Sequence, residues 1–517
     1  MGTLILVLAA CLAGPPLVVG LAAVGVPWQI TSALVASTAI VVLWRTARQA
    51  RAIGYQRLYW PAVVCVLTVL GAATIYTVRL STFMLDETRV DLSVLPNRAF
   101  FRAHSCLSSY TEAARLAPTG ANIFDVAQYS DPARPGQNLP RFIGAFEVDL
   151  YQYPPPFLVL PRAAVAAGLD FLTIRRLWFA IQSVVLFVAM VLLARWIGGS
   201  SALLVLLLVP VMWLSQTTRL GLQIGNFHLT AFALTVLAMM AFERGHAARG
   251  GLALGFAAVS KVYPGLLGVL LIVERRWRAV VWTVAWAVAV TAAAWLMVGS
   301  VPFVDFFRYQ LPRIESGQAF FWMEAADAAA INYGIHGLVI KLRFLGLPWT
   351  GPEAASRAAS LYAVLLLPLS FVSAWRLRAL ATAPIDPERL RLRKAQVWLG
   401  LLSLVSFRSP FVPDAYALVG TLWLLTLVAA EGHWQTRGRI ALLAASAAAM
   451  IVLDGGPIPA AVPAWIMAAT LAVQIAAIAF NAAIVLTPGR APVAGRMLRG
   501  PATARADDAI TMPTMTR

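Results

Sequence analysis

Long apolar runs recur along this 517-residue chain and restrict its fold more than any other feature. Runs of about 18 or more apolar residues are long enough to cross a hydrocarbon core of about 30 Å as helices. Only 12% of the residues are charged and 60% are hydrophobic, whereas soluble proteins carry about twice that share of charge. A soluble globular enzyme is therefore excluded, and the sequence predicts an all-α polytopic membrane protein.

About twelve membrane-spanning helices are predicted from these runs. The runs lie near residues 3–25, 28–44, 58–79, 177–195, 201–217, 227–243, 279–299, 358–375, 396–409, 412–430, 440–454 and 461–486. Basic residues gather in alternate short connections, which the positive-inside rule places in the cytoplasm together with both termini. Because the formal net charge of +18 is spread over these connections and forms no single patch, no nucleic-acid partner is predicted.

The run 250–273 does not fit this alternation, because basic residues flank it on both sides. Lys261 and Pro264 stand at its middle, where proline removes a helical hydrogen bond. A re-entrant pair of half-helices would satisfy both facts, since broken backbone at membrane depth is tolerated where it lines protein or a wet cavity. An ordinary span with basic flanks is the alternative, and both stay open.

The remaining polar sequence lies mainly in two long segments, 80–172 and 300–356, which the topology places outside the cytoplasm. We expect interfacial helices there and no separate domain. The chain then divides into four parts: two N-terminal spans with a cytoplasmic basic loop (1–57), a membrane core (58–430), C-terminal spans (431–487) and a disordered basic cytoplasmic tail (488–517).

Carboxylates collect just outside the predicted membrane. Asp86, Glu87 and Asp91 follow the third span, and Glu147 and Asp149 precede the point where the chain re-enters. An enzyme that takes a sugar from a lipid phosphate needs a carboxylate base at this height to deprotonate the incoming hydroxyl. The first three are the candidate catalytic residues, although a solvated loop explains them equally well.

The departing phosphate would need positive charge or hydrogen-bond donors. Candidates for this role are Arg219, Arg313, Arg408, His336 and Lys261. Each isolated arginine is alternatively a residue that anchors a loop at the lipid headgroups.

The three cysteines, Cys11, Cys65 and Cys106, form no disulfide framework and no cluster with metal-ligand spacing. No acidic metal-binding motif of the DxD type is present either. We therefore expect metal-independent chemistry without a cofactor.

Three motifs occur in order along the membrane core: EVDLYQYPPPFLVLPR (147–162), RLGLQIGNFHL (219–229) and ARGGLALGFAAVSKVYPGLLGVLLIVERRWR (248–278). Together they resemble glycosyltransferase family 87, over roughly residues 58–430. The resemblance implies a type C fold and a polyprenyl phosphate sugar donor, with mannosyltransferases of glycolipid assembly as known members. The residues that match the family patterns are Tyr153, Pro154, Pro155, Gln223, Gly225, Asn226, Lys261 and Pro264. Of these, Tyr153, Gln223 and Asn226 are expected in the substrate pocket.

The family's base is an aspartate near the start of the first outer loop, ahead of aromatic residues and an alanine pair. Here the pair Ala113 and Ala114 follows Tyr110, but Cys106 and Leu107 stand near the place of the aspartate. The sequence therefore departs from the family at this point, and Asp91 or, after it, Asp86 is expected to act from a shifted loop.

The predicted function is transfer of a hexose, with mannose favoured, from a polyprenyl phosphate donor to a lipid or glycan acceptor on the outer face of a bacterial cytoplasmic membrane. Membrane lipids would surround the enzyme. A transporter or lipid flippase is the alternative, although mid-span carboxylates and internal repeats are missing from the sequence. A non-catalytic scaffold would explain the spans but not the acidic cluster.

Overall fold

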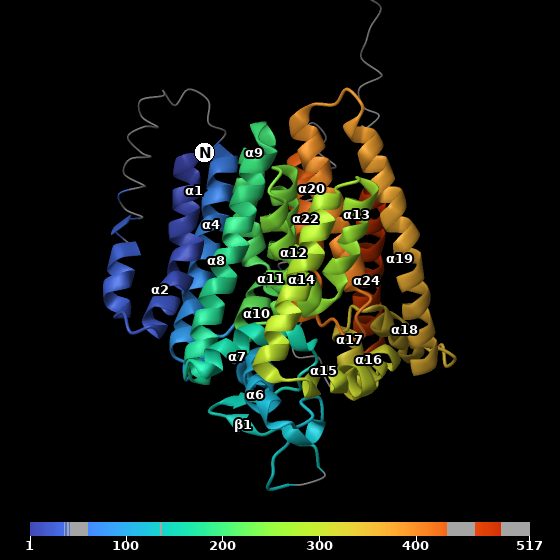
Figure 1. Ribbon diagram of the computed structural model, residues 1–517. Helices are drawn as coiled ribbons and strands as arrows, with labels where there is room; N and C mark the ends of the chain where they lie inside the picture. The colour runs from blue at the N-terminus through green and yellow to red at the C-terminus, as the bar shows by residue number, and fades with distance from the viewer. Residues whose placement is uncertain (36, 39–40, 42–59, 135–136, 432–460, 488–517) are drawn as a thin grey trace, which may run out of the picture.

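The computed structural model describes residues 1–35, 37–38, 41, 60–134, 137–431 and 461–487, and these form a bundle of helices with short helices gathered at one end (Figure 1). The predicted all-α polytopic class is confirmed for the described residues, apart from one short hairpin. The predicted span 440–454, the basic loop predicted to be cytoplasmic within residues 42–59 and the basic tail 488–517 lie outside the described residues.

The elements up to the first return to the bundle are α1 (Gly2–Leu8), the π-helical turn η1 (Ala9–Ala13), α2 (Gly14–Ala23), α4 (Trp60–Leu85), η2 (Val90–Leu92), α5 (Ala99–Ala103), α6 (Cys106–Leu116), η3 (Ala117–Thr119), η4 (Val126–Gln128), β1 (Phe142–Ile143), β2 (Phe146–Glu147), η5 (Pro155–Leu158) and α7 (Val159–Ala166). The central part contains α8 (Phe171–Ile197), α9 (Gly199–Leu214), α10 (Gln216–Ile224), α11 (Phe227–Glu243), α12 (Ala247–Lys261), η6 (Tyr263–Leu267), α13 (Gly268–Val273) and α14 (Trp277–Val298). The remainder contains α15 (Val301–Asp305), the π-helical η7 (Phe306–Gln310), α16 (Leu311–Ser316), η8 (Gln318–Glu324), α17 (Ala326–Ile331), α18 (Ile335–Phe344), α19 (Pro352–Ala381), α20 (Pro387–Ser406), α21 (Asp414–Ala417), α22 (Val419–Glu431) and α24 (Ala464–Leu486).

Seven helical segments in the described residues are long and apolar enough to cross a membrane, or eight if the bent pair α9–α10 counts as one span. The predicted number of about twelve is therefore not confirmed. Two predicted spans correspond to central helices that are short or polar at one end: α11 has 17 residues, and α20 begins with the charged sequence PERLRLRK. Both helices are buried among other helices, so neither needs an apolar surface in contact with lipid.

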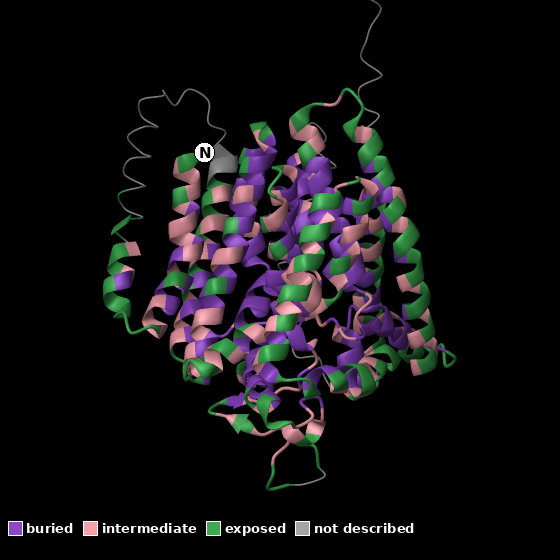
Figure 2. Ribbon diagram, in the orientation of Figure 1, coloured by how far each residue is buried: buried purple, intermediate pink, exposed green. Residues whose placement is uncertain are grey.

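Helices α14 and α19 lie at the periphery of the bundle and expose apolar side chains along their length (Figure 2). Leu296 on α14 is 85% exposed, and Leu361 and Val364 on α19 are each 62% exposed. Exposed apolar faces of this extent are stable in lipid and not in water. The helices α8, α11, α20 and α22 lie between such faces, and their buried apolar side chains form much of the core.

The segment 247–273 leaves one end of the bundle and returns to it. Helix α12 packs antiparallel to α11 and ends at Lys261; η6 and α13 then lead back to the start of α14. The two ends of this segment are joined by an ion pair from Arg276 to Glu243, at the end of α11. This path has the form of the re-entrant pair, and Lys261 stands at its tip.

A tight turn at Val262 makes this reversal. Its backbone angles, φ 44° and ψ −52°, lie in a region that a β-branched residue rarely adopts. The turn sends the neighbouring side chains of Lys261 and Tyr263 toward the same helix, α11. Strain of this kind persists only where surrounding contacts hold it, and it is common at functional sites.

The opposite end of the bundle is covered by the two long polar segments, as Figure 1 shows around α6, β1 and α15–α18. Helices α5, α6 and α7 lie in the first segment, and β1 and β2 form an antiparallel hairpin that the sequence did not predict. Helix α6 is buried at nearly all its positions. It is therefore part of the packed structure and more than an interfacial helix.

Ion pairs join the helices at the end of the bundle where the segment 247–273 begins and ends, here called the return end. In the sequence, the basic residues of these pairs indicated only the topology. Glu243 accepts hydrogen bonds from Arg276 and, at 2.6 Å, from Lys394 of α20, and Arg393 pairs with Glu431 of α22 at 2.6 Å. These pairs join α11, α20 and α22 to one another and to the start of α14.

We predict that Glu243→Gln lowers the free energy of unfolding by about 2 kcal/mol, because it leaves two partly buried cations without their shared carboxylate. Thermal unfolding of the purified protein in detergent measures the change. Glu353→Gln, at an exposed carboxylate in the first turn of α19, is the control and should leave the transition unchanged. Equal stability of the two variants would contradict this account.

Candidate active site

A cavity of about 1280 Å³ lies between the bundle and the outer segments. Its lining mixes apolar and aromatic surface with a few ionisable groups, as suits a ligand with a lipid part and a polar head. The ionisable and amide side chains of the lining are Asn97, Arg98, His104, Cys106, Tyr110, Asp149, Gln152, Tyr153, Asn226, His228, Lys261, Tyr263, Glu315, Asp327, Arg408 and Tyr416.

Asn226 is the point where the elements of the cavity meet. Gly225 ends α10 with a φ of 72°, and a side chain there would lie 2.8 Å from Leu107, so only glycine fits. The next residue, Asn226, is the N-cap of α11, with its Oδ1 accepting the backbone N–H of His228 at 3.0 Å. The local sequence therefore fixes the side chain of Asn226 at the junction of two helices.

The same Oδ1 accepts two further hydrogen bonds. Lys261 Nζ donates to it at 2.9 Å and the Tyr153 hydroxyl at 3.1 Å. On its other side, Asn226 Nδ2 donates to Cys106 Sγ at 3.4 Å. One carboxamide thus joins the return segment (247–273), the Tyr-Pro-Pro segment (153–155) and the start of α6.

Lys261 brings a positive charge to this junction. Its Nζ lies 5.3 Å from the ring centre of Tyr153 and 5.0 Å from that of Tyr416, both favourable cation–π distances. Within the part of the chain that the structure describes, no carboxylate lies within 4 Å of this ammonium group. Its charge is therefore available to an anionic ligand.

His228 adds a second polar group to the same wall. The Tyr263 hydroxyl lies 3.0 Å from its Nδ1, which orients the ring. Its Nε2 is buried and has no hydrogen-bond partner among the described residues, although the side chain lines the cavity. A buried polar atom of this kind is stabilised when a ligand supplies the missing partner.

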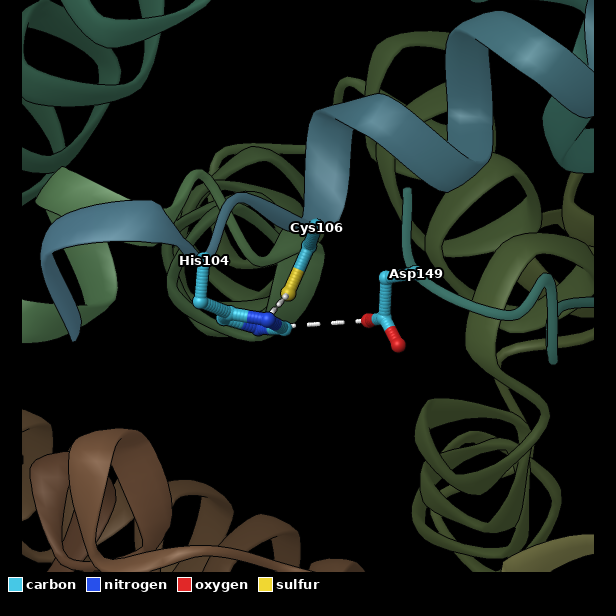
Figure 3. A group of neighbouring side chains, drawn as sticks. All are labelled: His104, Cys106 and Asp149. Atoms are coloured by element: carbon cyan, nitrogen blue, oxygen red, sulfur yellow. Dashed lines mark hydrogen bonds and ion pairs between the residues drawn. The ribbon is translucent and has the colours of Figure 1, made fainter. Parts of the chain in front are cut away.

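His104, Cys106 and Asp149 form a group at another part of the cavity wall (Figure 3). His104 Nε2 lies 3.6 Å from Cys106 Sγ and 3.9 Å from Asp149 Oδ2. Burial raises the pKa of the Asp149 carboxyl, against the opposing effect of His104 and of the Leu150 amide. Burial also raises the pKa of the Cys106 thiol to about 12, with the charge of Asp149 acting in the same direction.

Of the three carboxylates that line the cavity, Asp149 is the one connected to this network. Glu315 and Asp327 are exposed on the short helices of the second outer segment. Asp149 has one third of its side-chain surface exposed, and its Oδ2 lies 3.9 Å from His104 Nε2. His104 in turn lies 3.6 Å from the Cys106 sulfur, which accepts a hydrogen bond from Asn226. It combines access to the cavity with a fixed position, as a catalytic base requires.

The three predicted base candidates lie elsewhere. Asp86 is exposed and accepts hydrogen bonds from the hydroxyl and amide of Thr88, which lower its pKa. Glu87 lies 4.0 Å from Arg176, and Asp91, also exposed, lies 3.4 Å from Arg89. None of the three lines the cavity.

The predicted phosphate-binding residues divide in the same way. Lys261 and Arg408 line the large cavity, whereas Arg313 lines a separate cavity of about 170 Å³. Arg219 is buried in α10, where its Nε donates to the Leu214 carbonyl and its guanidinium lies over the Tyr76 ring. His336 is buried in α18 outside the lining.

Two predicted pocket residues, Tyr153 and Asn226, line the cavity, and the third does not. Gln223 instead accepts from the Val94 amide and donates to the Phe101 carbonyl, both at 2.7 Å, and so holds the first outer segment on α10. The roles of all these residues stay predictions.

His104, Cys106 and Asp149 were not among the predicted site residues. Asp149 precedes Tyr153 by four residues in the same motif and belongs to the carboxylates that the sequence places just outside the membrane. His104 and Cys106 have no comparable motif.

Comparison with known proteins gives one family. The model of glycosyltransferase family 87 matches residues 151–410, which include Tyr153, Asn226, Lys261 and Arg408. No curated protein and no solved structure matches the chain. The match begins just after Asp149, so the group His104, Cys106 and Asp149 lies before it. The chain belongs to glycosyltransferase family 87 and is a membrane glycosyltransferase.

Proposed function

We propose that this enzyme transfers a hexose from a polyprenyl phosphate sugar to a lipid or glycan acceptor at the outer face of a bacterial cytoplasmic membrane, with both termini in the cytoplasm. Mannose is the sugar that the family resemblance favours. Family membership supports transferase activity over the transporter or flippase that the sequence left as an alternative. The observation that carries the proposal is that Asp149 and Lys261 line one cavity and are connected by the contacts of His104, Cys106 and Asn226 between them.

The cavity suits such a donor by its volume and its lining. The end of the bundle where α14 begins lies opposite the outer segments around α6, β1 and α15–α18 (Figure 1). The ion pair between Arg276 and Glu243 precedes α14 at that basic end. A positive-inside orientation puts that end in the cytoplasm. Lys261 then lies below the outer interface, where a lipid phosphate can reach it while its prenyl chain stays in the bilayer.

Lys261 would stabilise the phosphate as it leaves. Negative charge develops on the phosphate oxygen when the bond to the anomeric carbon breaks, and a preorganised cation next to it lowers the barrier. Asn226 holds the ammonium group, and the free Nε2 of His228 offers a hydrogen bond to the sugar or the phosphate. Arg408, on the same cavity, is a further cation for the phosphate.

Asp149 would act as the base. Its carboxylate takes the proton of the acceptor hydroxyl, the hydroxyl oxygen forms a bond to the anomeric carbon, and polyprenyl phosphate departs with the electron pair. A single displacement of this kind inverts the anomeric configuration. The family resemblance places the base near Cys106, and the Asp149 carboxylate lies within 4.8 Å of the Cys106 sulfur. A carboxylate from a neighbouring segment thus stands beside the expected position.

We predict that Asp149→Asn lowers kcat by about 10²- to 10⁴-fold, the usual contribution of a general base. Asp91→Asn and Asp86→Asn are matched controls, because they remove carboxylates outside the cavity, and both should keep near-normal rates. The measurement is transfer of labelled mannose from polyprenyl phosphate mannose to extracted lipid, in membranes that contain each variant at equal abundance.

Full activity of Asp149→Asn would refute the role of this carboxylate. Loss of activity in Asp91→Asn or Asp86→Asn instead would restore the candidates predicted from the sequence. Absence of transfer by the wild-type chain from any polyprenyl phosphate hexose would refute the donor class.

We predict that Lys261→Met lowers kcat by about 10²- to 10³-fold, as expected for loss of one preorganised charge at the leaving group. Arg313→Met removes a cation that lines the smaller cavity and should change kcat less than threefold, an order-of-magnitude bound for a group remote from the reacting atoms. Steady-state kinetics with the labelled donor separates kcat from KM for both variants. The reverse order of the two effects would move the phosphate site to the smaller cavity.

A further inference from the structure

The group His104, Cys106 and Asp149 combines three different metal-ligating atoms at one part of the cavity wall (Figure 3). The side-chain donor atoms all lie within 4.8 Å of one another. The sequence predicts no such cluster, because Asp149 is far along the chain from the other two residues. Folding brings them together when the chain beside β2 packs on the turn before α6.

The two separations from His104 are close to those of a tetrahedral zinc site, and all three separations are at most 4.8 Å. Zinc bonds of about 2.3 Å to sulfur and about 2.0–2.2 Å to nitrogen and oxygen place neighbouring ligand atoms about 3.3–3.6 Å apart. The observed distances from His104 Nε2 are 3.6 Å to Cys106 Sγ and 3.9 Å to Asp149 Oδ2. Rotation of the side chains has to close the remaining gap for all three atoms to bind one ion.

Surrounding contacts hold the three ligands in place. The His104 ring is stacked on Phe100 with ring centres 4.4 Å apart, and the backbone of His104 forms a β-bridge with Glu147. The Ser108 hydroxyl accepts the Asp149 amide at 3.0 Å and lies 2.9 Å from the Glu147 carbonyl. Partners of this kind orient ligands in natural metal sites.

The hydrogen bonds of Asp149 and Cys106 also orient their ligand atoms. Asp149 Oδ1 accepts the Leu150 amide at 2.9 Å, which leaves Oδ2 toward His104. Asn226 Nδ2 donates to the Cys106 sulfur at 3.4 Å, which fixes the position of the sulfur at the cavity wall.

The chemistry of the ligands selects the ion. Calcium and magnesium prefer oxygen ligands, whereas one thiolate, one imidazole and one carboxylate suit zinc and cobalt. Three protein ligands leave the fourth tetrahedral position open, and here it would face the cavity that all three side chains line. An open position distinguishes this arrangement from a four-ligand structural site.

We propose that His104, Cys106 and Asp149 bind one zinc ion and that this binding switches the transferase off. The site itself depends only on the ligand geometry, whereas its inhibitory effect rests on the proposed function, in which Asp149 is the base. Coordination occupies the Asp149 carboxylate and releases the Cys106 thiol proton to solvent. The transfer reaction itself remains metal-independent, as the sequence predicts.

Binding is tested with cobalt(II), which replaces zinc and absorbs light when a thiolate coordinates it. The protein is the full chain in detergent, without a polyhistidine tag. Because the chain has only three cysteines, the double variant Cys11→Ser, Cys65→Ser leaves Cys106 as the sole thiol. This variant should show the near-ultraviolet thiolate–cobalt band at one ion per chain, and added zinc should abolish the band.

Cys106→Ser should lose the band, and His104→Ala should weaken cobalt binding by more than the roughly 10- to 100-fold that loss of an outer-shell partner costs. A band that persists in Cys106→Ser, or no band in the Cys11→Ser, Cys65→Ser variant, would overturn the site.

Inhibition is tested by comparing each protein with and without zinc. Zinc should lower wild-type transfer, and the zinc concentration for half inhibition should rise at least tenfold in Cys106→Ser, in line with loss of a metal ligand. Equal inhibition of both proteins, or a cobalt band without inhibition of the wild type, would overturn the switch. Failure of the metal-free wild type to transfer sugar, with the cobalt band intact, would refute the proposed function and leave the metal site standing.

Discussion

The carboxamide of Asn226 is the interaction on which the site depends. Its oxygen accepts hydrogen bonds from Lys261, from Tyr153 and from the backbone of α11, and its nitrogen donates to Cys106. These partners come from the return segment, the Tyr-Pro-Pro segment and the first outer segment. Each hydrogen bond is worth more here than at a wet surface, because a buried polar group left unpaired is costly. The site therefore forms as one unit with the bundle beneath it.

The placement of charge separates the two ends of the molecule. At the return end, the cations Arg276, Lys394 and Arg393 form ion pairs with Glu243 and Glu431. These pairs join helices and neutralise the charge of the cations. At the cavity, Lys261 is held by a neutral amide and by aromatic rings. A cation placed in an apolar bundle with neutral partners keeps a strong attraction for anions. This difference explains why a phosphate would bind at one end only.

Particular residues show how far the sequence alone could locate the site. Tyr153, Asn226 and Lys261 were expected from ordered motifs, and the structure brings these three together. Asp86, Glu87 and Asp91 were chosen for their height above a span, which says nothing about the direction of a side chain. Asp149 satisfies the same height criterion and also lines the cavity. Gln223, Arg219 and His336 are buried where a linear pattern suggests polar exposure, because α10 and α18 pack inside the structure.

The sequence by itself determined that this chain is a helical membrane protein, since no other structure satisfies the backbone of such long apolar runs. It also indicated the family, because the motifs that turn the chain at Gly225 and Val262 are local. Only the tertiary structure decided that Asp149 shares a cavity with Lys261 and that His104, Cys106 and Asp149 meet. Those contacts join segments that are distant along the chain, and their distances depend on helix packing, which no local pattern specifies.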